Sequence, residues 1–449
     1  MTISTTTQNR LFTPQFAAVA FAQLFSLLGE AILKFVLPLY LLNLTGSASL
    51  YGIVVACAFI PYIFLTPIGG ALADRVNKKR VMAVLDLVMA AASIAYLILA
   101  QTADLIVLTI VILMVLYAAQ SVYQPTVQSS VPSVVAHDRI RPATAIVTQV
   151  SALTGLIGPV VGGLVFGFFG VTPIVVVSTV AFLVSSGLVV ALVKIPSVAH
   201  KATGKPLAIL KGDIKDAARF LRKHPIMWKT ILLATIVNLV ASAFIIVGTP
   251  YMVTEVLGLS NQLMGIAEAA LAIGGLMGGI VISVKPDLFP ITRAPRFLLF
   301  ATLGFVPIAI VMALPLAPMT AYAVLLVSLS WTMASCSIFS IIGISFLQME
   351  TPSDLIGKVI ALTMSAANCA MPVGQLVFGI GFDMVQPTVL ASFVIVIMLC
   401  IAAFAARTFK REFKESETTE DTTSSARITE VDGTVAAKDK AVVGAAGAL

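Results

Sequence analysis

The sequence predicts an all-α membrane protein with twelve transmembrane helices arranged as two parallel six-helix repeats. Three observations predict it: an apolar composition, a succession of long hydrophobic runs, and residues that recur at one fixed offset. Of the 449 residues, 59% are hydrophobic and only 11% are charged, which is more apolar surface than a water-soluble fold can cover. Unbroken apolar runs favour helices over barrel strands, because barrel strands alternate apolar and polar residues.

The hydrophobic runs place the membrane spans, since one crossing takes about 20 residues. Spans are expected near 14–42, 50–73, 81–101, 104–130, 143–168, 172–194, 228–252, 262–284, 297–315, 319–347, 358–382 and 387–407. The expected organisation is an N-terminal six-helix bundle (12–194), a cytoplasmic linker with a basic amphipathic helix (195–227), a C-terminal six-helix bundle (228–407) and a disordered cytoplasmic tail (408–449).

Basic residues mark one side of the membrane. Lys and Arg gather in the loops near 75–80 and 139–141 and in the linker, whereas the loops at 43–49, 169–171 and 316–318 contain neither. By the positive-inside rule this pattern predicts a multi-pass plasma-membrane protein with both termini in the cytoplasm. The net charge of +7 is therefore a topology signal rather than a nucleic-acid surface. We expect a lipid bilayer and a small substrate as partners, no nucleic acid, and a monomer.

The four cysteines lie inside apolar runs and lack the spacing of metal ligands, so neither a metal site nor another cofactor is expected.

Two halves of the chain match at an offset of 212 residues. Pro38 matches Pro250, Gly46 matches Gly258, and the run Leu164–Gly167 matches Leu376–Gly379. Because the matched segments start on the same side of the membrane, the repeats run parallel about an axis along the membrane normal. Binding sites in such folds lie between the halves near mid-membrane.

Polar residues also recur between the halves. The set comprises Gln23, Ser26 and Glu30 in the first span, Thr235, Asn238 and Ser242 in the seventh, Tyr117, Gln120 and Gln124 in the fourth, and Thr332 in the tenth. Exposing these groups to hydrocarbon is unfavourable, so we expect them to line a shared cavity. The alternative is hydrogen bonding between helices. Trp331 is placed either in the cavity, where it could stack on a substrate, or in packing.

The loop after the second span carries a recognisable motif. The segment Gly70-Ala-Leu-Ala-Asp74-Arg75-Val-Asn77-Lys78-Lys79-Arg resembles the G-x-L-x-D-R-x-G-R/K-R/K signature of the major facilitator superfamily, with Asn77 in place of the usual glycine, a residue type that tolerates the left-handed conformation. The resemblance implies that this segment forms a cytoplasmic gate loop.

A second motif lies in the fifth span. The segment containing Gly158, Pro159, Gly162 and Gly163 resembles the G-P-x-x-G-G element of exporters in the same superfamily. Together with the segments around Pro61–Ile63 and Ala370–Gly374, it makes the chain similar to the macrolide efflux branch. The arginine that drug/proton antiporters often carry in the fourth span is missing.

Four ionisable residues within the predicted spans are candidates for a functional role. Glu30 and Lys34 are four residues apart on one helical face, and three interpretations remain open: proton coupling, binding of a cationic substrate, or a structural ion pair. Glu268 is a reserve proton site. Asp86, near the cytoplasmic end of its span, is expected to pair with Arg75 or Lys79 in the gate, with transport chemistry as the alternative.

These residues, together with what the resemblance implies, predict a secondary active transporter that exports small amphipathic, macrolide-like or multidrug compounds, with H⁺ as the coupling ion and alternating access as the mechanism. An exporter of one endogenous compound, such as a siderophore or lipid-like metabolite, is the first alternative, and a non-transporting membrane sensor is the second. The exporter element disfavours a nutrient importer. The sequence contains no H-E-x-x-H motif, nucleophile elbow or phosphate-binding loop, so an enzyme is not expected.

Overall fold

The computed structural model describes residues 13–73, 77–193, 206–284, 288–353 and 355–410. Within these residues, twelve helices are long and apolar enough to cross a membrane, as predicted. The spans of the first half are α1 (Pro14–Thr45), α2 (Ala48–Ala73), α3 (Lys78–Leu99), α4 (Leu105–Val134), α5 (Ile140–Phe169) and α6 (Val171–Leu192). Those of the second half are α8 to η3 (Pro225–Val256), α10 (Asn261–Val284), η5 with α11 (Ile291–Ala313), α12 (Pro318–Glu350), α13 (Ile356–Met384) and a last helix, Pro387–Lys410.

The seventh span differs from the single regular helix that the sequence predicts. It consists of α8 (Pro225–Val237), the π-helical turn η2 (Asn238–Ser242), α9 (Ala243–Pro250) and a second π-helical turn, η3 (Tyr251–Val256). Pro250 lacks the backbone N–H that a regular helix would use, which favours an irregular turn beside it. Such turns are rare in proteins, and those that occur often lie at functional sites.

The 212-residue repeat extends to backbone conformation. Gly46 and Gly258 both adopt the left-handed conformation, with φ of 64° and 62°, just after a long helix ends. Only glycine takes this conformation without steric cost, so the same turn is encoded in both halves. Gly162 packs on Val36 of α1, and its equivalent Gly374 packs on Leu239 and Ala243 of the seventh span. The equivalent helices therefore pack in equivalent ways.

The outer surface of the helices is apolar. Side chains such as Ile98, Val327 and Phe64 are 68%, 71% and 70% exposed. In water such exposure would be unfavourable, but hydrocarbon solvates it at no cost. This surface is the one that the bilayer covers.

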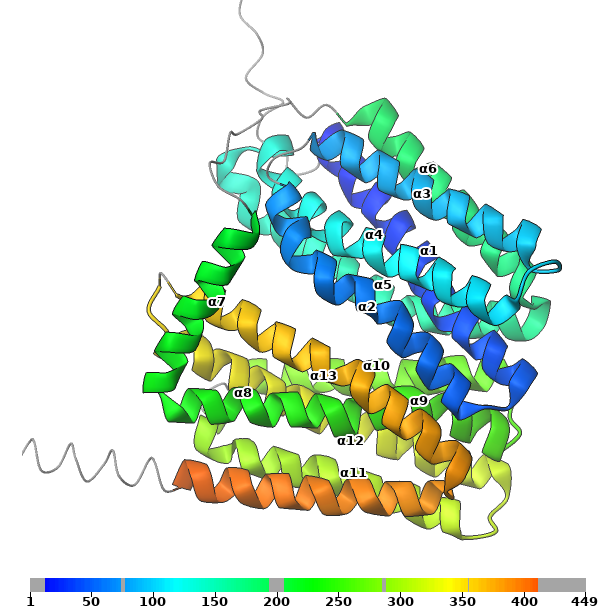
Figure 1. Ribbon diagram of the computed structural model, residues 1–449, viewed down its shortest axis with the longest axis vertical. Helices are drawn as coiled ribbons and strands as arrows, with labels where there is room; N and C mark the ends of the chain where they lie inside the picture. The colour runs from blue at the N-terminus through cyan, green and yellow to red at the C-terminus, as the bar shows by residue number, and fades with distance from the viewer. Residues whose placement is uncertain (1–12, 74–76, 194–205, 285–287, 354, 411–449) are drawn as a thin grey trace, which may run out of the picture.

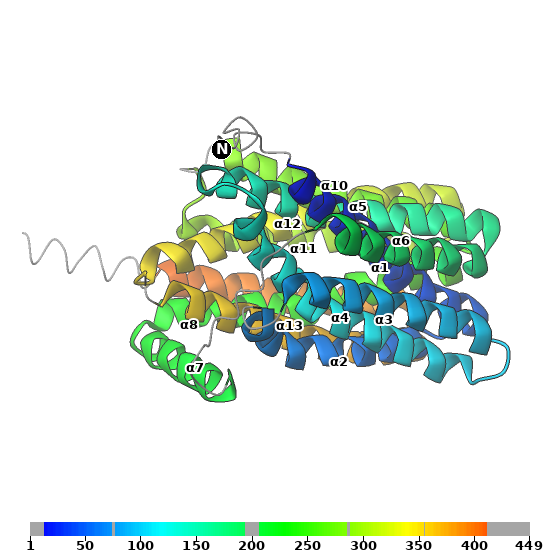
Figure 2. The ribbon, with the colours of Figure 1, turned by 90° about the horizontal axis from the view of Figure 1, so that it is seen from above.

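The two halves touch at one end of the molecule and diverge toward the other (Figure 1). At the end that holds the α1–α2 turn, which we call the closed end, α2 packs on α13 and α5 packs on α10. At the opposite or open end lies α7 (Pro206–Lys223), beside the start of α8 (Figure 1 and Figure 2).

Helix α7 lies in the segment for which an amphipathic helix is predicted. Ala217 and Leu221 are buried, whereas Ile214 is 46% exposed. The rest of the linker at 194–205 and the tail at 411–449 lie outside the described residues.

Candidate functional site

A cavity of about 390 Å³ lies in the first half, and its lining includes two charged side chains, Glu30 and Lys34. We call it the charged cavity. It is lined by Leu27, Glu30, Ala31, Lys34, Tyr62, Tyr117, Gln120, Gln124, Ser151, Thr154 and Gly155. These residues come from α1, α2, α4 and α5, and they include Glu30, Lys34, Tyr117, Gln120 and Gln124, which the sequence singled out.

Glu30 and Lys34 form an ion pair along α1. The Glu30 side chain is only 2% exposed and that of Lys34 is 11% exposed. Lys34 has two further partners: its ammonium donates to the Gln120 side-chain oxygen at 2.7 Å and lies 3.6 Å from the centroid of the Tyr117 ring. The ammonium is therefore held by two contacts besides its ion pair with Glu30.

The polar residues one and two turns before Glu30 point away from the charged cavity. Gln23 is fully buried and donates to the Val147 carbonyl at 3.1 Å and to Ser151 Oγ at 2.9 Å. Ser151 also accepts a bond of 2.6 Å from Gln124. Gln23 thus lies behind the wall, and it positions the serine that lines the cavity.

Asp86 lies inside the first bundle and is fully buried. Its two carboxylate oxygens accept hydrogen bonds of 2.6 Å from Ser26 and Ser185, which belong to α1 and α6. The ion pairs among the described residues include none between Asp86 and Lys79, and Arg75 lies outside those residues. The structure thus gives Asp86 hydroxyl partners where the sequence predicted a basic one, because α6 packs on both α3 and α1.

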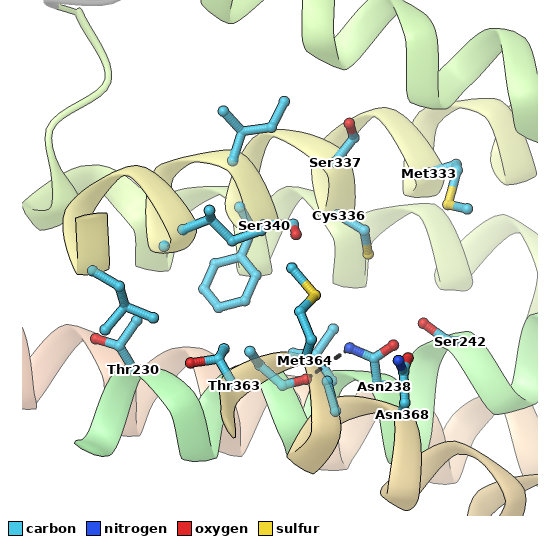
Figure 3. A pocket seen from close by; sticks show the side chains of 18 residues that line it. Thr230, Asn238, Ser242, Met333, Cys336, Ser337, Ser340, Thr363, Met364 and Asn368 are labelled. Atoms are coloured by element: carbon cyan, nitrogen blue, oxygen red, sulfur yellow. Dashed lines mark hydrogen bonds between the residues drawn. The ribbon is translucent and has the colours of Figure 1, made fainter. Parts of the chain in front are cut away.

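The second half holds a cavity of about 380 Å³ without any charged side chain. We call it the neutral cavity. α12 forms one wall, with Met333, Cys336 and Ser340, and the seventh span together with α13 forms the opposite wall, with Asn238, Ser242, Met364 and Asn368 (Figure 3). The π-helical turn η2 supplies Asn238 and Ser242, so the irregular backbone lies at the cavity wall.

The two cavities are equivalent in the repeat. Four wall positions correspond at the offset of 212 residues: Glu30 to Ser242, Gln124 to Cys336, Ser151 to Thr363 and Gly155 to Ala367. Sequence reasoning did not select Ser151, Thr363, Met364 and Asn368 as site residues. The same offset would have found the first two, because Ser151 and Thr363 are polar and equivalent.

Besides Gln23 and Ser26, three predicted cavity residues of the second half also lie off the cavity walls. Trp331 is 52% exposed and donates to the Phe300 carbonyl of α11 at 2.8 Å. Thr332 is fully buried with its hydroxyl directed at Gly304 of α11. Thr235 donates to Ile231 of its own helix at 2.8 Å. Trp331 therefore lies at the outer surface against α11, and none of these three residues is on the wall of the neutral cavity.

Glu268 lies in α10, which packs against α5 of the other half. Its side chain is partly buried and interacts electrostatically with Tyr51 of α2. No described basic residue forms an ion pair with it. Glu268 is thus a lone carboxyl near the contact between the halves, apart from both cavity walls.

The gate-loop residues are described in part. Asp74 and Arg75 lie outside the described residues, and Gly70 lies in the last turns of α2. Lys78, the first residue of α3, donates to the Ser129 carbonyl of α4, and Lys79 follows it in the first turn. Asn77 has a φ of −67° and accepts a hydrogen bond from the Arg80 amide. Asn77 therefore caps α3, and the left-handed conformation considered for it from the sequence does not occur.

The exporter-like element of α5 faces two ways. A methyl group on Gly158 would lie 2.5 Å from the Ala31 side chain, and Gly162 packs on Val36, so both face α1. Gly163 lies against Gly265 of α10, in the other half. Pro159 lies inside the helix between them. The small residues let α5 approach the helix of Glu30 on one side and the second half on the other.

Comparison with known proteins agrees with this geometry. Residues 19–375 match the model of the family described as Major Facilitator Superfamily. The chain is 22% identical over 374 residues to macrolide efflux protein A of Streptococcus pyogenes, covering 82% of this chain and 89% of that protein. It is 24% identical to the multidrug efflux pump Tap of Mycobacterium tuberculosis, covering 80% and 85%.

Solved structures share the fold at low identity. A bacterial homologue of the human lysosomal transporter Spinster, in an inward-facing conformation, superposes with a TM-score of 0.67 at 15% identity, covering 91% of this chain and 99% of that one. A bacterial homologue of the iron transporter ferroportin, also inward-facing, gives 0.66 at 15% identity, covering 88% and 98%.

Proposed function

The chain belongs to the Major Facilitator Superfamily and is a secondary transporter of the membrane, and from this premise we propose that it exports small amphipathic compounds in exchange for protons. The observation that carries the proposal is that Lys34 contacts Glu30, Gln120 and Tyr117 at the same time. The described ion pair of the buried Glu30 is with Lys34, and Lys34 also contacts the Gln120 side chain and the Tyr117 ring. This arrangement lets a cavity carboxyl alternate between a proton and an ion pair.

The proposed cycle starts from the described conformation. If both termini are cytoplasmic, as the basic loops predict, the closed end faces outward and the charged cavity opens inward. Proton binding at Glu30 releases Lys34 to Gln120 and Tyr117, and the reversal restores the ion pair. Glu268 is the reserve site for the proton, because it is a lone acid near the contact between the halves.

The neutral cavity suits the body of the substrate. Met333, Cys336 and Met364 give polarisable apolar surface that adapts to irregular shapes, while Asn238 and Asn368 supply hydrogen bonds. Binding a sugar would require more hydrogen-bonding groups than this cavity contains, and binding a polyanion would require basic side chains. The names of the efflux relatives support the same class of substrate, macrolide-like or multidrug compounds.

The test uses everted membrane vesicles with an acidic interior, supplied with a fluorescent cationic dye and with a macrolide. We expect accumulation inside the vesicles, and we expect Glu30→Gln to abolish it with expression intact. Glu350→Gln is the matched control, since Glu350 is exposed at the end of α12. Normal transport by Glu30→Gln would transfer the proton role to Glu268. Transport of one compound from a broad panel would favour an exporter of a specific metabolite.

A further inference from the structure

The closed end contains a carboxylate that caps a helix of the other half. Asp383 lies in the last turn of α13, and α2 of the first half begins at Ala48. Asp383 accepts hydrogen bonds from the backbone amides of Ala48 and Ser49, at 2.7 and 2.9 Å, and from the Ser47 hydroxyl at 2.7 Å. One charged side chain thus satisfies the exposed amides at the start of α2 and faces its positive dipole end.

Close backbone packing surrounds this cap. A methyl group on Gly379 would lie 2.8 Å from the Ala48 carbonyl, and one on Gly52 would lie 2.5 Å from the Gln375 carbonyl. The Asn43 and Asn261 amides join the halves at 2.7 Å. These contacts are between neutral groups, so the charge-assisted bonds of Asp383 are the strongest polar link described at this end.

The chain also offers a cap that stays within one half. Asp104 precedes α4 and accepts hydrogen bonds from the Ile106 and Val107 amides at 2.9 and 3.1 Å. Both aspartates cap helices that start at the closed end. Only the Asp383 cap must break when the halves separate there.

We propose that Asp383 is the lock of the closed end: its bonds to α2 hold the halves together in the described conformation and break each time the transporter opens at this end. The proposal requires only that the halves rock, which follows from the family, and it goes beyond the export proposal because it depends on neither substrate nor coupling ion. Two other titratable groups, Tyr251 and Glu255 of η3, face the same region, and the described bonds from the Ala48 and Ser49 amides go to Asp383.

The experiment measures the distance between the halves at the closed end. Spin labels are attached at Thr102 and Ala317, two exposed positions in closed-end turns of opposite halves, after the four native cysteines are replaced. Double electron–electron resonance spectroscopy in detergent, without substrate, gives the populations of short and long distances between the two labels. In Asp383→Asn the amide group would meet two N–H donors, so we expect the ratio of long to short distances to rise roughly tenfold, the factor for one charge-assisted bond.

The Asp104→Asn variant should keep the distance distribution of the unsubstituted protein. Folded Asp383→Asn protein with an unchanged distribution overturns the proposal, as does an equal shift in Asp104→Asn. If Asp383→Asn does not fold, Ser47→Ala decides: a smaller shift toward long distances supports the lock, and no shift overturns it. Neither result depends on whether the vesicle assay detects export.

Discussion

The ammonium of Lys34 lies 3.6 Å from the centroid of the Tyr117 ring, while the same ammonium pairs with Glu30. A ring at this distance attracts a cation with about 0.5–2 kcal/mol, depending on how well water is excluded. In the proposed cycle the ring and the carboxylate therefore compete for Lys34, and the balance between them sets how readily Lys34 leaves Glu30.

Removing the ring should disturb this balance. We expect Tyr117→Leu to lower the rate of proton-driven dye accumulation roughly fivefold, because a loss of about 1 kcal/mol leaves Lys34 more firmly on Glu30. Tyr117→Phe is the matched control, since it keeps the ring and removes only the hydroxyl. Initial rates in acid-loaded everted vesicles measure both. Equal rates for the leucine and phenylalanine variants would mean that the ring does not contribute.

The buried hydrogen bonds of Asp86 should contribute to stability. Asp86→Ala leaves Ser26 without its acceptor, whereas Ser185 can turn to the Ala22 carbonyl, from which it lies 2.8 Å. We expect a loss of about 2 kcal/mol, the cost of one buried unsatisfied donor with some lost packing. Thermal unfolding in detergent measures it. Ser93→Ala, which removes a buried hydroxyl bonded within its own helix, should change stability far less.

The same measurement tests the gate interpretation of Asp86. If Asp86 pairs with Lys79 in another conformation, Lys79→Met should destabilise the protein as much as Asp86→Ala does. We expect Lys79→Met to have little effect on unfolding, because the carboxylate is held by hydroxyls.

Repeats and helix spacing were readable from the sequence because they follow from local rules. A single offset linked Gly46 to Gly258, and both have the left-handed backbone that this turn requires. The spacing of four residues between Glu30 and Lys34 predicted one helical face, and the two side chains pair on it. Hydropathy alone located the spans, since lipid requires long apolar helices.

Side-chain directions on a long helix were less predictable. Steps of four residues advance about 40° around a helix with 3.6 residues per turn, so a row at this spacing winds slowly off one face. In α12 the row from Thr332 through Cys336 to Ser340 starts against α11 and ends in the neutral cavity. The partners of Asp86 and the π-helical turn at Asn238 depend on how separate helices pack, which a single sequence does not encode locally.

The small residue at Gly158 should be required for the position of α1. A methyl group there would lie 2.5 Å from the Ala31 side chain, next to Glu30. We expect Gly158→Ala to destabilise the protein by about 1–3 kcal/mol through overpacking and to reduce transport. Gly187→Ala is the control, because nothing lies within 4 Å of its added methyl group, and a helical alanine should leave stability equal or slightly higher. Thermal unfolding of the two variants in one detergent compares them directly.

The attachment of α7 to α13 should depend on charge. Lys358 at the start of α13 pairs with Asp216 at 2.8 Å and Asp213 at 3.0 Å, both on α7. The hydrogen bond and charge of Lys358 hold the pKa of Asp216 below its usual value. A depressed pKa means that the contribution is fully present above the ordinary aspartate pKa of about 3.9 and is lost as the pH falls through the lowered value. Attachment should therefore be unchanged between pH 8 and pH 5.

Because these groups are exposed, salt should weaken the attachment at neutral pH. We expect Lys358→Met to speed hydrogen exchange of the α7 amides and to remove its dependence on salt. Lys223→Met, at the exposed end of α7, is the matched control and should retain both slow exchange and salt dependence. Exchange in the Lys358 variant as slow as in the unsubstituted protein would mean that the buried face at Ala217 and Leu221 holds α7 in place without the ion pairs.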